Sequence, residues 1–293
     1  MSAQTPPTLL KLARQALLRD ETLDMSALNK VPMELLPARF KEALTGRHTM
    51  TVKAMVAAWS FPYLPVGALM KTADFETFQA VLAGVDMQLQ RKIHSRRKLQ
   101  VLDLRKKHHE FWSIWAGAED GDCSAEAPDE QQVVKVLPRY ALRWCLKVVA
   151  DLWLGPCIDE EQSCLLNWAQ LRKSSIQFCC MEMKIWALSL YVTGGVFNVF
   201  RAEHIEDLEL IMISWDVLKL SQLAPCLGRM RNLRKFFLAH IFKNVFMIGN
   251  RTTDKEEKFV RKFISQFYKL NCLQYLSMNG IYFLRDHLNL VLG

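Results

Sequence analysis

Apolar residues with the spacing Leu-x-x-Leu-x-Leu return along the chain and constrain its fold more than any other feature. In a strand, the last two positions of such a triplet share one face, while the first lies in the turn that leads in. Each triplet therefore predicts a short strand with three buried side chains. The triplets are Leu99, Leu102 and Leu104; Ile205, Leu208 and Leu210; Leu233, Phe236 and Leu238; Leu273, Leu276 and Met278; and, more loosely, Phe178, Met181 and Met183.

The last four triplets in the chain begin 27, 28 and 40 residues apart, and 27 to 28 residues is a period of leucine-rich repeats. Helical returns are expected between the strands, at 217–228 and at 254–268. We therefore predict an α/β fold, a right-handed leucine-rich-repeat solenoid that forms an irregular horseshoe. The alternative is a set of ordinary buried strands in an α/β domain. The solenoid is expected to be irregular because the usual Asn or Cys after the triplet is replaced by Lys107, Trp186, Ile213, Ile241 and Ile281.

Two regions are expected along the chain. Residues 1–90 form an N-terminal helical region that caps the solenoid, and residues 91–293 form the irregular repeats, with an acidic loop at 116–132. Within the first region, helices are predicted from Thr8 and over 31–44, 50–59 and 74–90. Gly46 lies just past the end of the second helix, where glycine is common.

The composition of the chain is that of a folded protein without a membrane span. Of its 293 residues, 51% are hydrophobic and 23% charged. Its start lacks the pattern of a signal peptide, and the most apolar region, 181–200, contains charges and glycines. The eight cysteines include no Cys-x-x-Cys pair, which favours free thiols in a reducing compartment. We expect a cytoplasmic protein, with nuclear localisation as an open alternative, and neither metal nor cofactor.

The net charge of +8 comes mainly from one segment, 91–109, which carries eight Lys or Arg residues against Asp103 alone. A nuclear-localisation or nucleic-acid patch is one interpretation of such a segment. Because these charges flank the strand predicted at 98–104, we interpret them as the solvated ends of a repeat and expect no nucleic-acid partner.

No catalytic motif is present, so we expect no enzyme. His108 and His109, close to Glu110 and Cys123, are the nearest approach to a metal or nucleophile site. Neighbouring side chains at a strand end point apart, which favours a solvated pair. A glycine-rich phosphate loop and the His-Glu-x-x-His motif are absent.

Several strings resemble the PRAME family, the family of the preferentially expressed antigen of melanoma, and the resemblance extends over essentially the whole chain. Members are usually longer, so the resemblance implies a shortened member. The strings are Val31-Pro32-x-Glu34-Leu35, Gly46-Arg47-His48, Lys53-Ala54-Met55-Val56-x-x-Trp59, 98–106, Phe111-Trp112, 205–209, Leu227-Gly228-x-Met230-x-Asn232-Leu233-Arg234, Gln266-Phe267 and Cys272-Leu273-Gln274.

The resemblance implies a substrate receptor of a cullin-RING ubiquitin ligase, which promotes proteasomal degradation. Its partners would be elongins B and C, the second cullin with its RING subunit, and an unknown protein substrate. Leu9, Ala13 and Leu17 would form one helical stripe, with the small residue allowing close approach. An N-terminal cap of the solenoid would produce the same pattern. The implied elongin box is Thr8, Leu9, Ala13 and Leu17, and the implied cullin box is Val31, Pro32, Leu35 and Phe40.

A second class of function also comes with the resemblance: a transcriptional corepressor that acts through nuclear receptors on proliferation, differentiation and apoptosis. The Leu-x-x-Leu-Leu motif of receptor-binding segments is absent from the chain, which argues against direct contact. In either case the partner would bind side chains of the repeat strands. Candidates are Glu209, Trp215, Arg234, Gln274 and Tyr275.

Overall fold

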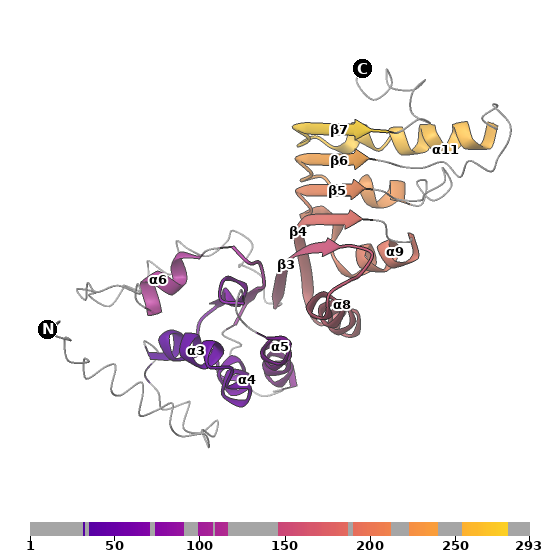
Figure 1. Cartoon of the computed structure of the whole chain (residues 1–293). Coiled ribbons are helices and arrows are strands. Elements are labelled where there is room, and N and C mark those ends of the chain that lie inside the picture. Colours follow the sequence, from indigo (N-terminus) through magenta and orange to yellow (C-terminus); the bar gives the residue numbers. More distant parts are fainter. Residues whose placement is uncertain are drawn as a thin grey trace, which may run out of the picture. The chain divides into compact units, whose positions relative to one another are not determined.

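The chain divides into two compact units, Met1–Leu146 and Lys147–Gly293 (Figure 1). A computed structural model describes residues 32, 35–70, 74–90, 99–107, 109–116, 146–186, 190–211, 223–239 and 254–280. The sequence predicts a division after residue 90, whereas the two compact units divide after Leu146. Strand β1 (Tyr63–Leu64) pairs in parallel with β2 (Val101–Asp103), so residues on both sides of position 90 share one unit.

Helices dominate the first unit, and the three predicted over 31–44, 50–59 and 74–90 are confirmed with small shifts of their ends. The first begins later than predicted, at Leu36, and has a proline in its first turn. It ends at Gly46, whose N–H donates to Glu42 O at 2.8 Å. The helices are α3 (Leu36–Thr45), α4 (Thr49–Ala57), the short 3-10 helix η2 (Val66–Ala68), α5 (Phe75–Gln90) and α6 (Glu110–Ala116).

An aromatic cluster forms much of the core of the first unit. The rings of Phe40 and Trp59 lie 5.2 Å apart between centroids, and those of Phe40 and Trp112 stack at 5.9 Å. Both indole N–H groups are satisfied: Trp59 Nε1 donates to Tyr63 O at 3.1 Å, and Trp112 Nε1 donates to Pro65 O at 2.8 Å. The cluster thus joins α3, α6 and the segment around β1 without an unsatisfied indole.

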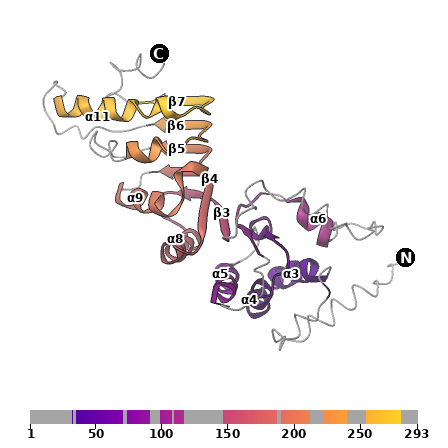
Figure 2. The same cartoon turned by 180° about the vertical axis from the view of Figure 1, so that it is seen from behind.

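The second unit is built on five parallel strands that pair in chain order, β3 to β7 (Figures 1 and 2). Short parallel strands in sequential order require a return segment after each one. The three strands predicted after residue 200, which are β5, β6 and β7, are confirmed, whereas β3 was not predicted. The strands are β3 (Lys147–Leu154), β4 (Gln177–Trp186), β5 (Asp207–Ile211), β6 (Lys235–Ala239) and β7 (Tyr275–Asn279).

The register of these strands aligns the predicted triplets. Leu208 pairs with Phe236 and Phe236 with Leu276, so their side chains form one apolar row. The looser triplet in β4 was wrong by two residues. Met183, and not Met181, pairs with Leu208. The triplet of β4 is therefore Cys180, Met183 and Ile185, all fully buried, and the cysteine in its first position hid the match.

The return segments cover the inward face of the five strands. Trp168 of α8 packs edge-on against Phe178 at 5.6 Å, and Phe236 lies 5.8 Å from Phe267. The helix predicted over 254–268 is confirmed, although it is split into α11 and η4, and 223–227 of the return predicted at 217–228 is helical. The returns include α8 (Glu160–Arg172), α9 (Leu190–Val199), η3 (Ala202–His204), α11 (Asp254–Ile264) and η4 (Phe267–Lys269).

Two segments singled out from the sequence lie mainly outside the described residues. The acidic loop predicted at 116–132 lies outside the described residues except for Ala116. The basic segment is described only from Leu99 onward, apart from His108. In the parts of the chain that the structure describes, no helix has the length and apolar character to cross a membrane.

Candidate functional site

Opposite their buried rows, the five strands of the second unit present partly exposed side chains from Asp151 of β3 and Glu182 of β4 onward, and this surface is the candidate site. Side chains alternate along a strand, so Met183 and Ile185 point into the core while Glu182, Lys184 and Trp186 point out. We call this surface the outward strand face. It comprises Asp151, Trp153, Glu182, Lys184, Trp186, Asp207, Glu209, Lys235, Phe237 and Tyr275.

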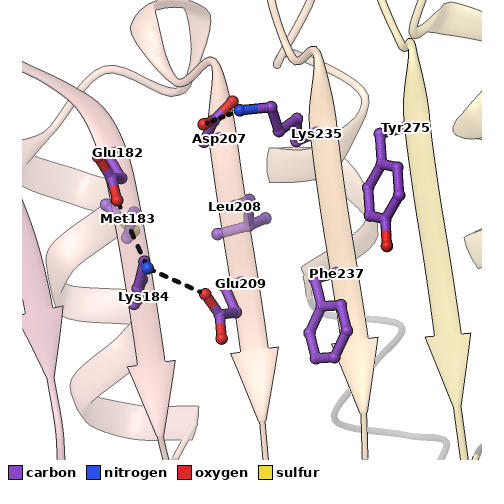
Figure 3. A pocket seen from close by; sticks show the side chains of 9 residues that line it. All are labelled: Glu182, Met183, Lys184, Asp207, Leu208, Glu209, Lys235, Phe237 and Tyr275. Carbon is purple, nitrogen blue, oxygen red and sulfur yellow. Dashed lines mark hydrogen bonds and ion pairs between the residues drawn. The ribbon is translucent and has the colours of Figure 1, made fainter.

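Two lateral rows of side chains run across the outward strand face (Figure 3). In register order, the first consists of Glu182, Asp207, Lys235 and Tyr275, and the second of Trp153, Lys184, Glu209 and Phe237. Paired strands lie about 4.8 Å apart, so neighbours in a row are close enough to interact. The first row thus runs from three charged groups to the ring of Tyr275, and in the second row the charged Lys184 and Glu209 lie between the rings of Trp153 and Phe237.

The two lysines of the face are held by its carboxylates. Lys184 Nζ lies 3.5 Å from Glu182 Oε1 and 3.4 Å from Glu209 Oε2, and it also lies 5.2 Å from the ring centroid of Trp153. Lys235 Nζ lies 3.1 Å from Asp207 Oδ2. One ammonium group thus satisfies two carboxylates and an indole at once.

The outward strand face is acidic although the chain is basic. Its four carboxylates are those of Asp151, Glu182, Asp207 and Glu209, and its two cations are Lys184 and Lys235. The difference gives a formal charge of −2, against +8 for the whole chain. Such a local reversal of sign sets the charge of the partners that the face attracts.

A shallow hollow of about 320 Å³ lies within this face. Its lining joins charged groups of β4 and β5 to the rings of Phe237 and Tyr275, while Met183 and Leu208 contribute at its floor (Figure 3). Tyr275 is 55% exposed. Two further rings of the face, Trp153 (58%) and Trp186 (48%), lie outside the hollow and are similarly exposed. Aromatic rings are enriched in surfaces that bind other proteins.

Neither buried cysteine of β4 is suited to nucleophilic chemistry. Burial raises the pKa of the Cys179 thiol to about 11, and burial raises that of Cys180 well above its usual range. Both side chains are buried, so both stay protonated at neutral pH. Within the described residues, no group of three or more His, Cys, Asp or Glu residues could hold a metal ion.

His109 differs from the solvated histidine expected from sequence. It is half-buried, its ring packs on that of Tyr63 at 4.8 Å, and its Nδ1 accepts the N–H of Phe111 at 3.1 Å. This contact places it at the start of α6 as a structural residue. His108 and Cys123 lie outside the described residues.

The residues of the implied elongin and cullin boxes are only partly described. Pro32 is exposed, and Leu35 is half-buried at the start of α3, where its N–H donates to Pro32 O at 3.0 Å. Phe40 is fully buried in the aromatic cluster, so its ring is a core residue. Thr8, Leu9, Ala13, Leu17 and Val31 lie outside the described residues.

Two of the five predicted partner-facing residues, Glu209 and Tyr275, lie on the outward strand face. Arg234 and Gln274 are exposed immediately before β6 and β7, and Arg234 pairs with Glu206 at 3.6 Å. Trp215 lies outside the described residues. The other residues of the face were missed, and Asp151 and Trp153 of β3 belong to no triplet. The triplets indicate several others, those of β4 only once its triplet is corrected to Cys180, Met183 and Ile185, because the third and fifth positions of Leu-x-x-Leu-x-Leu point outward. Those positions hold Glu182 and Lys184 in β4, and Lys235 and Phe237 in β6.

Comparisons with known proteins match the chain over nearly its whole length. A family model described as the PRAME N-terminal domain matches residues 6–112, and one described as the PRAME C-terminal domain matches residues 146–293. Human PRAME family member 12 is 40% identical over 294 residues, and human PRAME family member 20 is 38% identical over 295 residues. Both alignments cover 100% of this chain but only 59% and 61% of the relatives, so the chain spans about three fifths of their length.

Proposed function

The chain belongs to the PRAME family, and from this membership we propose that it is a non-catalytic adaptor, the substrate receptor of an elongin-dependent cullin-RING ubiquitin ligase. In this proposal the second unit is an irregular leucine-rich-repeat solenoid that binds the substrate. The first unit recruits elongins B and C and the second cullin with its RING subunit. The adaptor acts in the cytoplasm, with a nuclear pool as the alternative.

The strand register supports the solenoid. Parallel strands pair in chain order from β3 to β7, and the apolar positions of successive triplets form continuous rows, as in proteins built of stacked repeats. The triplet starts at Cys180, Ile205, Leu233 and Leu273 lie 25, 28 and 40 residues apart. Each described return packs on the inward face, which leaves the opposite face open for a partner.

The outward strand face is the single observation that carries a binding function. It joins exposed aromatic rings, paired charges and a hollow of about 320 Å³ on a rigid set of strands. Rigid side-chain arrays of this kind bind without large ordering costs. The cysteines of β4 are protonated, and the lysines are engaged by carboxylates, which favours a binding role over a catalytic one.

A pull-down of purified chain with elongins B and C tests the recruiting half of the proposal. We expect binding by the native chain and its loss in a Leu9→Asp, Leu17→Asp double variant, because charge in the apolar stripe would disrupt helix packing. Phe40 is unsuitable for this test because it is a core residue, and its loss would unfold α3. The matched control is Leu171→Asp, an exposed leucine of α8 in the other unit.

Retained elongin binding by the double variant would overturn the assignment of Thr8, Leu9, Ala13 and Leu17. A cell assay separates the proposal from the corepressor alternative. If the chain acts through the ligase, the double variant, which no longer binds elongins, should also lose repression of a reporter gene. Repression that survives in the double variant would favour the corepressor.

A further inference from the structure

We infer that the outward strand face binds an extended polypeptide segment that carries arginine or lysine next to an apolar side chain. This inference rests on the proposed function, of which it specifies the substrate class. It depends on the charge and the aromatic content of five described strands, and not on the elongin and cullin boxes.

The charge of the outward strand face favours a basic partner. The face has four carboxylates and two ammonium groups, whereas the chain as a whole has an excess of eight positive charges. An acidic partner would meet Glu182, Asp207 and Glu209 at close range, and like charges at an interface are strongly unfavourable. A basic segment, in contrast, brings the charge that these carboxylates attract.

The surroundings of Lys184 show what kind of group the face holds. This ammonium lies between Glu182 and Glu209 and above the ring of Trp153, the combination of carboxylates and an aromatic ring that binds cations. The chain thus places its own lysine where a partner cation would be bound. A guanidinium, which pairs with carboxylates in a bidentate manner and stacks on indole, fits the same groups better than an ammonium does.

The other end of each row supplies the apolar contact. Phe237 and Tyr275 line the hollow on the side of β6 and β7, where Phe237 neighbours Glu209 and Tyr275 neighbours Lys235 (Figure 3). A partner side chain seated between the two rings would be held by burial of apolar area, while its basic neighbour reaches the carboxylates of β4 and β5. The recognised segment therefore combines one aliphatic or aromatic residue with one or more cations.

Phage-displayed random dodecapeptides, selected on the immobilised full chain, test the inference. We expect enrichment of sequences with arginine or lysine within a few positions of an apolar residue. Synthetic fluorescein-labelled copies of the enriched peptides then give affinities by fluorescence anisotropy, which should fall as salt is raised. Enrichment of acidic or purely apolar sequences, or the absence of any enriched sequence, would overturn the inference.

Two sets of variants with opposite expected effects connect binding to the face. Glu182→Gln with Glu209→Gln should weaken binding of the enriched peptide by roughly ten-fold or more, because the cation loses both carboxylates. Lys184→Gln should strengthen it several-fold, roughly, because the carboxylates no longer share an internal ammonium. The matched control is Glu257→Gln on α11, an exposed carboxylate paired with Arg261 at 2.7 Å, which should leave the affinity unchanged.

A thermal melt of each variant shows whether the fold is kept, and Asp207→Asn replaces the double variant if that protein unfolds. Equal affinities in the native chain, the face variants and Lys184→Gln would overturn the inference. The elongin pull-down reports separately on the proposed function. Peptide binding without elongin binding would leave the inference standing and remove the ligase role, whereas elongin binding without peptide binding would do the reverse.

Discussion

At the scale of single residues, the carboxylate of Asp103 connects two strands of the first unit through several short hydrogen bonds. It is 3% exposed, its Oδ2 accepts the hydroxyl proton of Tyr63 at 2.6 Å, and Arg105 donates to it from Nε at 2.9 Å and from Nη2 at 2.6 Å. A buried carboxylate is stable only when such partners replace water. The contacts join β1 to the end of β2.

Asp103→Asn should lower the free energy of unfolding by about 2 kcal/mol, because the neutral amide leaves the Arg105 guanidinium without its counter-charge in a nearly buried site. Urea unfolding measures the change. The control is Arg47→Gln, which breaks an exposed ion pair with Asp74 at 3.4 Å and should cost less than about 0.5 kcal/mol. Equal effects of the two substitutions would contradict a stabilising role for Asp103.

His204 is a residue through which we expect the stability of the second unit to depend on pH. Burial, followed by the nearby charges of Lys147 and Arg201, lowers the pKa of its imidazole below the ordinary 6.5. Its Nε2 lies 2.9 Å from Gln177 Nε2. An amide nitrogen has no lone pair to offer, so it donates and the neutral ring accepts. Protonation of the ring would remove this bond.

The unfolded chain therefore binds a proton near pH 6.5 that the folded chain takes up only at lower pH, and stability should fall as the pH is lowered below about 6.5. His204→Gln should flatten this dependence, since glutamine does not titrate. The measurement is the unfolding midpoint in urea between pH 7.5 and 5. The same slope in the variant and the native chain would rule out His204 as its source.

At the scale of elements, neighbouring residues of one strand have opposite roles. Phe236 of β6 is fully buried and contacts Phe267 at 5.8 Å, whereas Phe237 lies on the outward strand face beside the hollow. Pairing with β5 and β7 fixes this arrangement, because a shift of one residue would exchange the two rings.

Phe236→Ala should destabilise the chain by about 3 to 5 kcal/mol, the usual cost of removing a buried aromatic ring. Phe237→Ala should cost less than about 1 kcal/mol and instead weaken binding of the selected basic peptide. Thermal unfolding and fluorescence anisotropy on the same two proteins give both numbers. A folded Phe236→Ala protein with impaired peptide binding beside an unaffected Phe237→Ala protein would show that the assignment of faces is reversed.

At the scale of the whole molecule, the proposal gives the two units separate tasks. The implied boxes precede residue 41, in the first unit, and the outward strand face belongs entirely to the second. The matching family models are divided in the same way, at residues 6–112 and 146–293. An adaptor of this kind holds a ligase subunit and a substrate at the same time.

The two activities should be separable by substitution. Leu9→Asp with Leu17→Asp should abolish elongin capture and leave peptide binding unchanged, and Glu182→Gln with Glu209→Gln should do the opposite. The test measures elongin pull-down and peptide anisotropy for each of the two double variants of the full chain and compares the four results. Loss of both activities in a folded variant of either pair would contradict two independent sites.

The last three strands of the second unit could be predicted from the sequence alone. The triplets at 205–210 and 233–238 placed their strands correctly, because burial of one strand face imposes an alternation that the sequence displays directly. Three helices of the first unit, α3, α4 and α5, were also predictable within a few residues from their apolar period and from Gly46, whereas α6 was not predicted. Family membership followed from low-probability strings, such as 98–106.

The other features of the fold and of the candidate site depend on pairing between segments that are distant in sequence, so only the three-dimensional structure shows them. Cys180 and Met183 join the buried apolar rows because β4 aligns with β5, and no local pattern marks a cysteine as equivalent to a leucine. Phe40 turned out to be a core residue because Trp59 and Trp112, distant in sequence, close over it. The acidic outward strand face likewise exists only through register, which brings isolated carboxylates from three strands, β3, β4 and β5, onto one surface.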